Sequence, residues 1–191
     1  MHRYFLLLCF LTAPAWSIDS MYLLKTKQYQ ALHRYLDGVF LQHTNGALSE
    51  QKLGQALEPF ATSDPDLSVR LNDWLTAMPN AWQPHLAAGI YYQHLAWLSR
   101  GEHYVSHTSR QQLQDMKSHR AKAIAHLTRT TVIEPKLPHA WAYLINLTKL
   151  MKGADDTERL YQQAKLYVPS SFVLHWNYAN AKTPKWGGSM Q

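Results

Sequence analysis

The residues best suited to chemistry in this chain are histidines, of which there are eleven. His103 and His107 are four residues apart, a spacing that places two imidazole rings on one face of a helix. Glu102 could add an oxygen ligand, although Gly101 and the polar neighbours favour a loop over a helix. The sequence contains no HExxH signature of the zinc proteases. His103 and His107 are therefore candidate metal ligands, beside the simpler interpretation of scattered surface histidines.

Four other histidines also have spacings that suit one helical face. His85 and His94 are nine residues apart, and His119 and His126 are seven apart. Surface positions and helix caps account for such histidines without a metal. The sequence accordingly predicts no resident metal and no other cofactor.

Two pairs of carboxylates, Asp64 with Asp66 and Asp155 with Asp156, are the remaining candidates for acid–base chemistry. Both pairs fall at predicted helix starts, where a negative charge meets the positive end of the helix dipole. Capping explains them without catalysis. The sequence also lacks a glycine-rich phosphate loop and a GxSxG nucleophile motif. It therefore favours a non-enzymatic protein, and no catalytic residue is predicted.

Two segments are not explained by helix formation alone. The first runs from Trp97 to Gly101 with Tyr104 close behind, and the second is Pro184-Lys185-Trp186-Gly187-Gly188-Ser189. A glycine pair after a tryptophan is costly to order unless the backbone turns sharply or approaches another group closely. The segments form either a turn that docks Trp186 on the helices, locked by Arg100, or a binding site. The candidate residues are Trp97, Arg100, Gly101, Tyr104, Lys185, Trp186, Gly187 and Gly188.

The elements that must position these residues are helices. From Met21 onward apolar residues recur at helical spacing, and the alternation typical of strands is missing. Ser63-Asp64-Pro65-Asp66 has the composition of a helix start, and Ser109 with Gln112 matches a capping box. The fold class is therefore all-α. The predicted helical segments are 24–45 as one apolar stripe, 53–60, 66–78, 82–98, 109–133, 138–152, 155–167 and 170–183.

A possible repeat organises the second half of the chain. Pro135 and Pro169 are 34 residues apart, which is the period of tetratricopeptide repeats. Residues 138–171 place aromatic, large and small side chains at the expected positions, at Trp141, Tyr161 and Ala164. A plain helical hairpin that matches by chance is the alternative. The pattern favours stacked antiparallel helix hairpins in a tetratricopeptide-like solenoid or bundle, whose concave surface is suited to a peptide or protein partner.

The first residues have the order of a secretory signal peptide. A basic start is followed by an apolar run over Tyr4–Thr12 and by the small residues Ala13-Pro14-Ala15. The run is shorter than the ~20 residues that span a bilayer, which favours cleavage over a membrane anchor. We expect residues 1–17 to be removed, with cleavage after Ala15 or Ser17, and 18–191 to form a single domain.

Cleavage would change which residues the mature chain contains, its single cysteine above all. Cys9 is the only cysteine, so the mature chain would have no disulfide, thiol nucleophile or thiolate ligand. The expected location is the periplasm or the outside of the cell, with no transmembrane segment after cleavage. The net charge of +6 fits solubility or acidic envelope surfaces, and nucleic acid is not an expected partner of an exported protein.

The whole pattern resembles a known family. The residues that carry the resemblance are Leu32 and Leu36, Trp74 with Pro79, the Trp97 to Tyr104 segment, and the motif at 184–190. The chain resembles the bacterial, exported, tetratricopeptide-like family called domain of unknown function 4034. Lys185 stands where that family usually has arginine, and its members commonly continue beyond the motif. The resemblance implies architecture and export but carries no catalytic residues.

Two functional hypotheses follow. The first is an exported helical-repeat protein that binds a protein or peptide partner or acts as a scaffold in the cell envelope. The alternative is an envelope enzyme or metal-binding protein with a site around Arg100, His103, His107 and Trp186.

Overall fold

The computed structural model describes residues 19–101, 108–150 and 154–186. Within these ranges the chain forms nine α-helices, two short 3₁₀ helices and no strand, so the all-α prediction is confirmed. Residues 1–17, the expected signal peptide, lie outside the described part, so export and cleavage stay predictions. None of the helices in the described ranges combines the length and apolarity that a membrane crossing requires.

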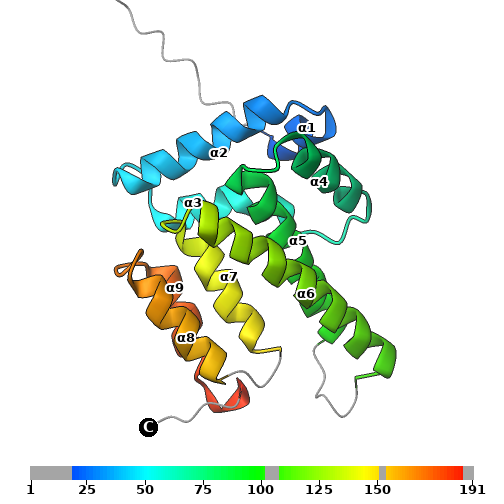
Figure 1. Ribbon diagram of the computed structural model, residues 1–191, viewed down its shortest axis with the longest axis vertical. Coiled ribbons are helices and arrows are strands. Elements are labelled where there is room, and N and C mark those ends of the chain that lie inside the picture. Colours follow the sequence, from blue (N-terminus) through cyan, green and yellow to red (C-terminus); the bar gives the residue numbers. More distant parts are fainter. Residues whose placement is uncertain (1–18, 102–107, 151–153, 187–191) are drawn as a thin grey trace, which may run out of the picture.

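The helices follow one another in two groups. The first group comprises α1 (Ser20–Lys25), α2 (Tyr29–Thr44), α3 (Glu50–Leu57), the 3₁₀ helix η1 (Glu58–Phe60) and α4 (Asp66–Ala77). The second comprises α5 (Trp82–Arg100), α6 (Arg110–Ile133), α7 (Pro138–Thr148), α8 (Ala154–Lys165), α9 (Phe172–Ala181) and the 3₁₀ helix η3 (Pro184–Trp186). Figure 1 shows α2 lying across one end of the molecule, with α5 to α9 extending away from it.

Local signals set most helix starts. The Ser109 hydroxyl accepts from the Gln112 backbone N–H at 3.2 Å, and the Gln112 side chain accepts from the Ser109 N–H at 3.0 Å, so the predicted capping box is present. Asp64 Oδ1 accepts from the Asp66 N–H at 3.0 Å where α4 begins. Ser171 caps α9 through the Leu174 N–H at 3.1 Å. Each of these bonds satisfies a backbone donor that the helix itself leaves unpaired.

Three predicted boundaries are wrong. The stripe expected to be one helix over 24–45 is two helices, because Lys27 adopts a left-handed φ of 55° and reverses the chain after α1. Helix α7 ends at Thr148 rather than at residue 152. Helix α8 begins at Ala154, so Asp155 and Asp156 lie inside its first turn, where they face the positive end of the dipole, rather than before it.

One continuous core joins the two groups. Large side chains of α1 to α4 are fully buried, and those of α5, α6 and α7 extend the same cluster. Helices α5 and α6 approach closely because Gly89 has no side chain: a Cβ there would lie 2.6 Å from the Leu127 side chain. The fully buried large side chains of the first group are Leu24, Leu32, Leu36, Leu53, Leu57, Phe60, Leu67, Leu71 and Trp74.

Neighbouring helices in the second group pack as antiparallel pairs. Helix α5 packs on α6, α7 on both α6 and α8, and α9 on both α7 and α8 (Figure 1). The predicted repeat at 138–171 thus corresponds to the hairpin α7–α8 followed by the start of α9. Trp141 and Ala164 are buried in it, and Tyr161 stacks on Tyr178 of α9 with ring centroids 3.7 Å apart.

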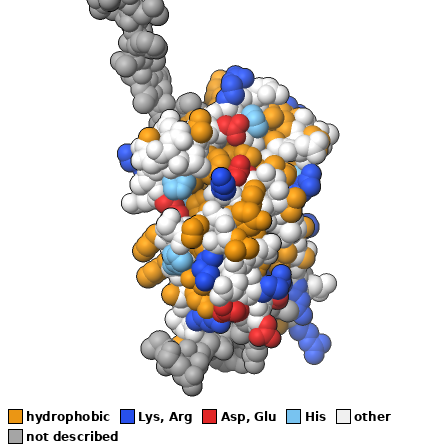
Figure 2. Space-filling view, turned by 60° about the vertical axis from the view of Figure 1, so that its left-hand side comes forward, with side chains coloured by type: hydrophobic (Ala, Val, Ile, Leu, Met, Phe, Trp, Pro, Cys, Tyr) orange, Lys and Arg blue, Asp and Glu red, His pale blue; other side chains and the backbone are white. Residues whose placement is uncertain are grey.

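Hydrophobic side chains also reach the surface. Figure 2 shows them in patches, interrupted by charged and histidine side chains, on the face that it presents. Phe172 and Trp176 of α9 are 72% and 60% exposed and stack on each other with centroids 6.2 Å apart. The last helix therefore keeps an apolar outer face.

Candidate functional site

The two segments that the sequence singled out meet in the structure. Trp97 lies near the C-terminal end of α5 and Trp186 ends η3, and their rings form an edge-to-face pair with centroids 5.5 Å apart. The Lys185 ammonium lies 5.0 Å from the ring centroid of Trp186. Residues 89 positions apart in the chain are thereby brought into contact.

The other candidates of the first segment sit where α5 ends. Gly101 has a φ of 65°, a conformation that favours glycine, and its N–H donates to the carbonyls of Trp97 and Leu98. An Arg100 Nη donates to the Thr108 hydroxyl at 3.4 Å across the loop between α5 and α6.

The remaining sequence candidates lie outside the described residues. They are His103, Tyr104, His107, Gly187 and Gly188. The metal and enzyme hypothesis that used His103 and His107 therefore stays a prediction. Within the described ranges no three side chains of the metal-binding types come together.

Around Trp97 the structure adds residues that the sequence analysis missed. The Trp97 indole N–H donates to Asn146 Oδ1 at 2.6 Å, and the Gln93 amide donates to the same oxygen at 3.0 Å. The Asn146 amide nitrogen donates in turn to Asn177 Oδ1 at 3.2 Å. We call Gln93, Trp97, Asn146, Lys149 and Asn177 the amide cluster; it connects α5, α7 and α9.

Lys149 completes the cluster beside the two tryptophans. Its ammonium lies 5.3 Å from the Trp97 ring centroid and 5.5 Å from that of Trp186, and it donates to Asn180 Oδ1 at 3.1 Å. Burial, and to a smaller extent repulsion from Lys185, holds the pKa of Lys149 below its usual value. The aromatic faces and an amide oxygen thus solvate a half-buried cation.

The polar groups at the centre of the amide cluster bond to one another and to neighbouring residues of α9. The Asn146 oxygen receives two bonds and its nitrogen gives one, and the Asn177 nitrogen donates to the Val173 carbonyl at 2.9 Å. Such a network fixes the relative positions of three helices and holds η3 against α5. The available sequence signal was Asn146 itself, a polar residue between Ile145 and Leu147 in an apolar helix.

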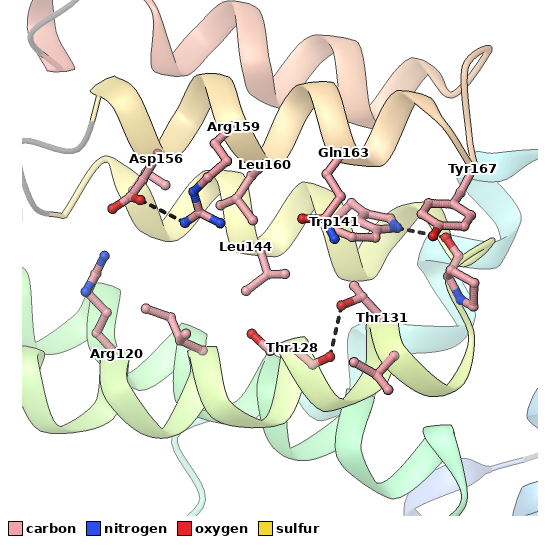
Figure 3. Close-up of a pocket in the computed structure, with 14 residues that line it drawn as sticks. Arg120, Thr128, Thr131, Trp141, Leu144, Asp156, Arg159, Leu160, Gln163 and Tyr167 are labelled. Atoms are coloured by element: carbon pink, nitrogen blue, oxygen red, sulfur yellow. Dashed lines mark hydrogen bonds and ion pairs between the residues drawn. The ribbon is translucent and has the colours of Figure 1, made fainter.

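The opposite face of α7 borders a cavity. Helices α6 and α8 form its walls and α7 its floor, and its volume is about 470 Å³. Figure 3 shows side chains from the three helices pointing into this space. We call it the groove; it is lined by Arg120, Ile124, Thr128, Thr131, Val132, Pro135, Trp141, Leu144, Thr148, Asp156, Arg159, Leu160, Gln163 and Tyr167.

The groove has an apolar end and a charged end. Trp141 and Tyr167 stack at one end with centroids 6.1 Å apart, and Leu144 lies on the floor. At the other end Arg159 pairs with Asp156 at 2.9 Å, and Arg120 points towards them from α6 (Figure 3). A concave surface of this volume and composition falls in the range of ligand-binding sites.

Arg120 is the distinctive residue of the charged end. It is half-buried, and its Nε donates to the Leu147 carbonyl at 3.0 Å. Burial lowers the pKa of its guanidinium, and nearby Asp156 partly offsets that effect. Among the described residues no carboxylate lies within ion-pair distance of Arg120, so both Nη groups can donate to an external anion.

The comparison with known families agrees with the resemblance seen in the sequence. The family described as domain of unknown function (DUF4034) matches residues 18–165. The chain belongs to this family. A search of the curated proteins gives no significant match. A search of the solved structures gives none either.

The DUF4034 match covers the groove and the amide cluster to different extents. It includes α1 to α8 and thus all three helices of the groove. It ends at residue 165, before α9, Trp186 and the 184–190 motif on which the resemblance partly rested. The groove is therefore built within the matched residues, apart from Tyr167, whereas the amide cluster depends on α9, which lies beyond them.

Proposed function

We propose that the protein is an exported, non-enzymatic helical-repeat protein that binds a peptide segment of a partner in the groove. The single observation that carries the proposal is the half-buried Arg120 guanidinium at the charged end of a cavity that both polar and apolar side chains line. Export is supported by the signal-like order of residues 1–17, and repeat character by the 34-residue spacing and the α7–α8 hairpin.

The charges at the groove define the expected peptide. Arg120 and Arg159 contribute two positive charges and Asp156 one negative charge, so the charged end has a net charge of +1. A half-buried guanidinium is stabilised by an anion that it can contact with two N–H groups. We therefore expect a carboxylate of the peptide at Arg120.

The apolar part of the groove defines the rest of the peptide. The exposed Val132 and Tyr167 and the half-buried Leu160 offer apolar contact surface above a floor that the buried Trp141 and Leu144 form. Thr128 and Gln163 at the walls are exposed and can bond to a backbone. The expected ligand is thus a short segment that combines apolar residues with an aspartate, a glutamate or a free C-terminal carboxylate.

A peptide selection tests the proposal. Random peptides displayed on phage are selected on the purified full chain, and the most enriched peptide is titrated in solution. We expect enrichment of apolar residues next to an acidic group. Selection that enriches no peptide, or only basic ones, would contradict the proposal.

Variants locate the binding surface. Thr128→Trp fills the groove from the exposed wall of α6 and should abolish binding. Gln111→Trp places the same side chain at an exposed position of α6 outside the groove and should bind like the wild type. Equal affinities of the two variants would place the peptide elsewhere.

Arg120→Gln tests the charge. Loss of a charge-assisted bond is worth about 1.5–3 kcal/mol, so the affinity should fall about 10- to 100-fold. Lys117→Gln removes an exposed cation from the same helix, outside the groove, and should change the affinity little. A similar loss in both variants would indicate unspecific attraction by net charge.

A further inference from the structure

The turn between α8 and α9 carries four strongly exposed apolar side chains. Leu166 and Tyr167 lie just after α8 and are 79% and 44% exposed, and Phe172 and Trp176 follow on α9. Four of the nine large hydrophobic side chains that are exposed among the described residues thus fall within positions 166–176. Single exposed apolar residues are ordinary on a protein surface, whereas a group of them marks a surface that another molecule covers. We call these four residues the apolar ridge.

The chain around the ridge is uncharged in its middle and basic at its ends. Residues 166–181 contain no aspartate, glutamate, lysine or arginine, and Lys165 and Lys182 stand directly on either side of them. Lys182 pairs with Glu158, which is the last acidic residue of the sequence. Figure 1 shows the turn at the left-hand edge of the molecule. The ridge is thus an uncharged, protruding surface next to cations.

Two lysines beside the ridge can receive an external anion. Lys136 is exposed and lines a hollow of about 630 Å³ together with Tyr167 and Phe172. The Lys165 ammonium lies 5.0 Å from the ring centroid of Tyr161. Within the described ranges no carboxylate lies at ion-pair distance from either of these two lysines.

The turn pairs several of its own polar groups within the protein. The N–H groups of Tyr167 and Val168 donate to the Ala164 carbonyl, and the Ser171 N–H donates to the Val168 carbonyl. Glu50, which also lines the hollow, accepts from the Ser171 hydroxyl at 2.6 Å and from a backbone N–H of α9 at 2.9 Å. Polar groups that are already paired lower the cost of moving this turn out of water.

We propose that the apolar ridge binds the surface of a lipid bilayer that contains anionic lipids, with Phe172 and Trp176 inserted at the level of the headgroups. Aromatic side chains favour the boundary between headgroups and acyl chains, and lysines beside them are attracted to anionic headgroups. The ridge lies on the membrane and does not cross it, because α9 has only ten residues. The proposal is independent of peptide binding in the groove, which shares only Tyr167 with the ridge.

A second copy of the chain fits the ridge less well than a membrane does. Since a whole aromatic side chain covers about 150–250 Å², the exposed parts of the four side chains offer on the order of 500 Å². A stable interface takes about 800 Å² from each partner. A symmetric pair would also bring the lysines of one copy towards those of the other, and residues 160–191 contain no carboxylate to pair with them. Anionic lipids supply that missing negative charge.

Co-sedimentation of the purified full chain with lipid vesicles tests the proposal. We expect binding to vesicles made of phosphatidylglycerol and phosphatidylcholine in equal parts. Binding to pure phosphatidylcholine should be weaker by about fivefold for each of the two lysines. Binding to neither kind of vesicle, or equal binding to both, would overturn the proposal.

Two double variants locate the contact. Phe172→Ser with Trp176→Ser should weaken binding to the mixed vesicles by about tenfold or more, because less apolar area enters the bilayer. Tyr22→Ser with Val69→Ser removes two similarly exposed side chains from α1 and α4 and should change the binding little. Equal losses in the two double variants, or binding that survives in the first, would assign the contact to another part of the chain and overturn the proposal.

A second pair of double variants tests the charges. Lys136→Gln with Lys165→Gln should weaken binding to the mixed vesicles by about fivefold per lysine and leave the binding to pure phosphatidylcholine unchanged. Lys25→Gln with Lys117→Gln removes two exposed cations from α1 and α6 and should have a smaller effect. A similar loss in both would indicate attraction by net charge alone and would overturn the role of the ridge.

Fluorescence keeps the test decisive if a double variant fails to fold. Trp176→Tyr retains an aromatic ring at the ridge and should bind the mixed vesicles like the wild type. Lipids brominated in their acyl chains should quench the tryptophan emission of the wild type more than that of Trp176→Tyr. Equal quenching would place a different tryptophan in the bilayer and overturn the proposal.

Two controls separate the membrane from the other possible partners. Thr128→Trp, which fills the groove, should bind the vesicles like the wild type; loss of vesicle binding would assign the contact to the groove. Sedimentation velocity without vesicles should show a monomer. A dimer that Phe172→Ser with Trp176→Ser dissociates would make a second copy the occupant of the ridge and overturn the proposal.

Discussion

The two faces of α7 differ in how completely their polar groups are paired by hydrogen bonds within the protein. On the face of Asn146 and Lys149, side chains fill the space and bond to one another. The face of Trp141 and Leu144 leaves a cavity of about 470 Å³, and the Nη groups of Arg120 at its end have no ion-pair partner among the described residues. A satisfied network holds helices together, whereas a cavity with a guanidinium that keeps N–H groups available suits an external anion. We therefore assign structure to the first face and binding to the second.

The largest expected effect concerns a polar side chain of α7 that lies on neither face. His139 is 5% exposed, its Nδ1 has no partner among the described side chains and backbone, and Gly54 of α3 packs against its ring. Burial lowers the pKa of His139 to about 4, from 6.5 in the unfolded chain. Burial therefore disfavours the charged imidazole, whereas aromatic rings and an amide oxygen solvate the Lys149 cation of the amide cluster.

Acid should therefore destabilise the fold through His139. As the pH falls from 6.5 to 4, the unfolded chain takes up the proton first, so the free energy of unfolding falls, by up to about 3 kcal/mol from this residue. Urea unfolding at several pH values should show a smaller pH dependence in His139→Gln than in the wild type. His85, His119 and His126 have lowered pKa values too and keep their contribution in the variant. Identical pH profiles would contradict the assignment.

The next effect concerns the centre of the amide cluster. Asn146→Ala removes the acceptor of the Trp97 and Gln93 donors and the donor to Asn177. Three bonds of about 0.5–1.5 kcal/mol each, at half-buried positions, predict a loss of about 2 kcal/mol in the free energy of unfolding. Chemical denaturation measures it.

A matched asparagine provides the control for this loss. Asn72→Ala changes an exposed asparagine in the middle of α4 and should stay within about 0.5 kcal/mol of the wild type. Equal stability of the two variants would mean that the amide cluster does not hold α5, α7 and α9 together.

The smallest effect concerns the contact between α8 and α9. The Tyr178 hydroxyl donates to Glu158 at 2.6 Å, and Lys182 pairs with the same carboxylate at 3.0 Å. Tyr178→Phe keeps the ring that stacks on Tyr161 and removes one bond at a partly exposed site, so a loss of about 0.5–1 kcal/mol is expected. A loss above about 2 kcal/mol would show that this contact, and not the amide cluster, secures α9.

Local features of the fold could be predicted from the sequence. The capping box of Ser109 and Gln112 and the start of α4 at Asp66 depend on residues within four positions of one another. The break at Lys27 could not be predicted, because it depends on a left-handed backbone at a residue without a turn preference. The apolar stripe of α1 and α2 continues across it.

The surfaces could be predicted only in part. Unusual composition pointed to Trp97 and Trp186, and the structure brings them together. The partners of Trp97 lie 49 or more residues away in the chain. The groove combines polar and apolar residues that come mostly from three different helices. No sequence motif distinguishes Arg120, because its role depends on the helices that bury it.

The central claim is that the groove binds a peptide and that the amide cluster stabilises the fold. One paired measurement tests this claim most directly. The selected peptide is titrated against Thr128→Trp and Asn146→Ala, each under conditions where circular dichroism shows it folded. We predict that Thr128→Trp loses binding while its stability stays near that of the wild type, and that Asn146→Ala loses stability while its affinity is kept. Binding that survives in Thr128→Trp and fails in Asn146→Ala would contradict the account.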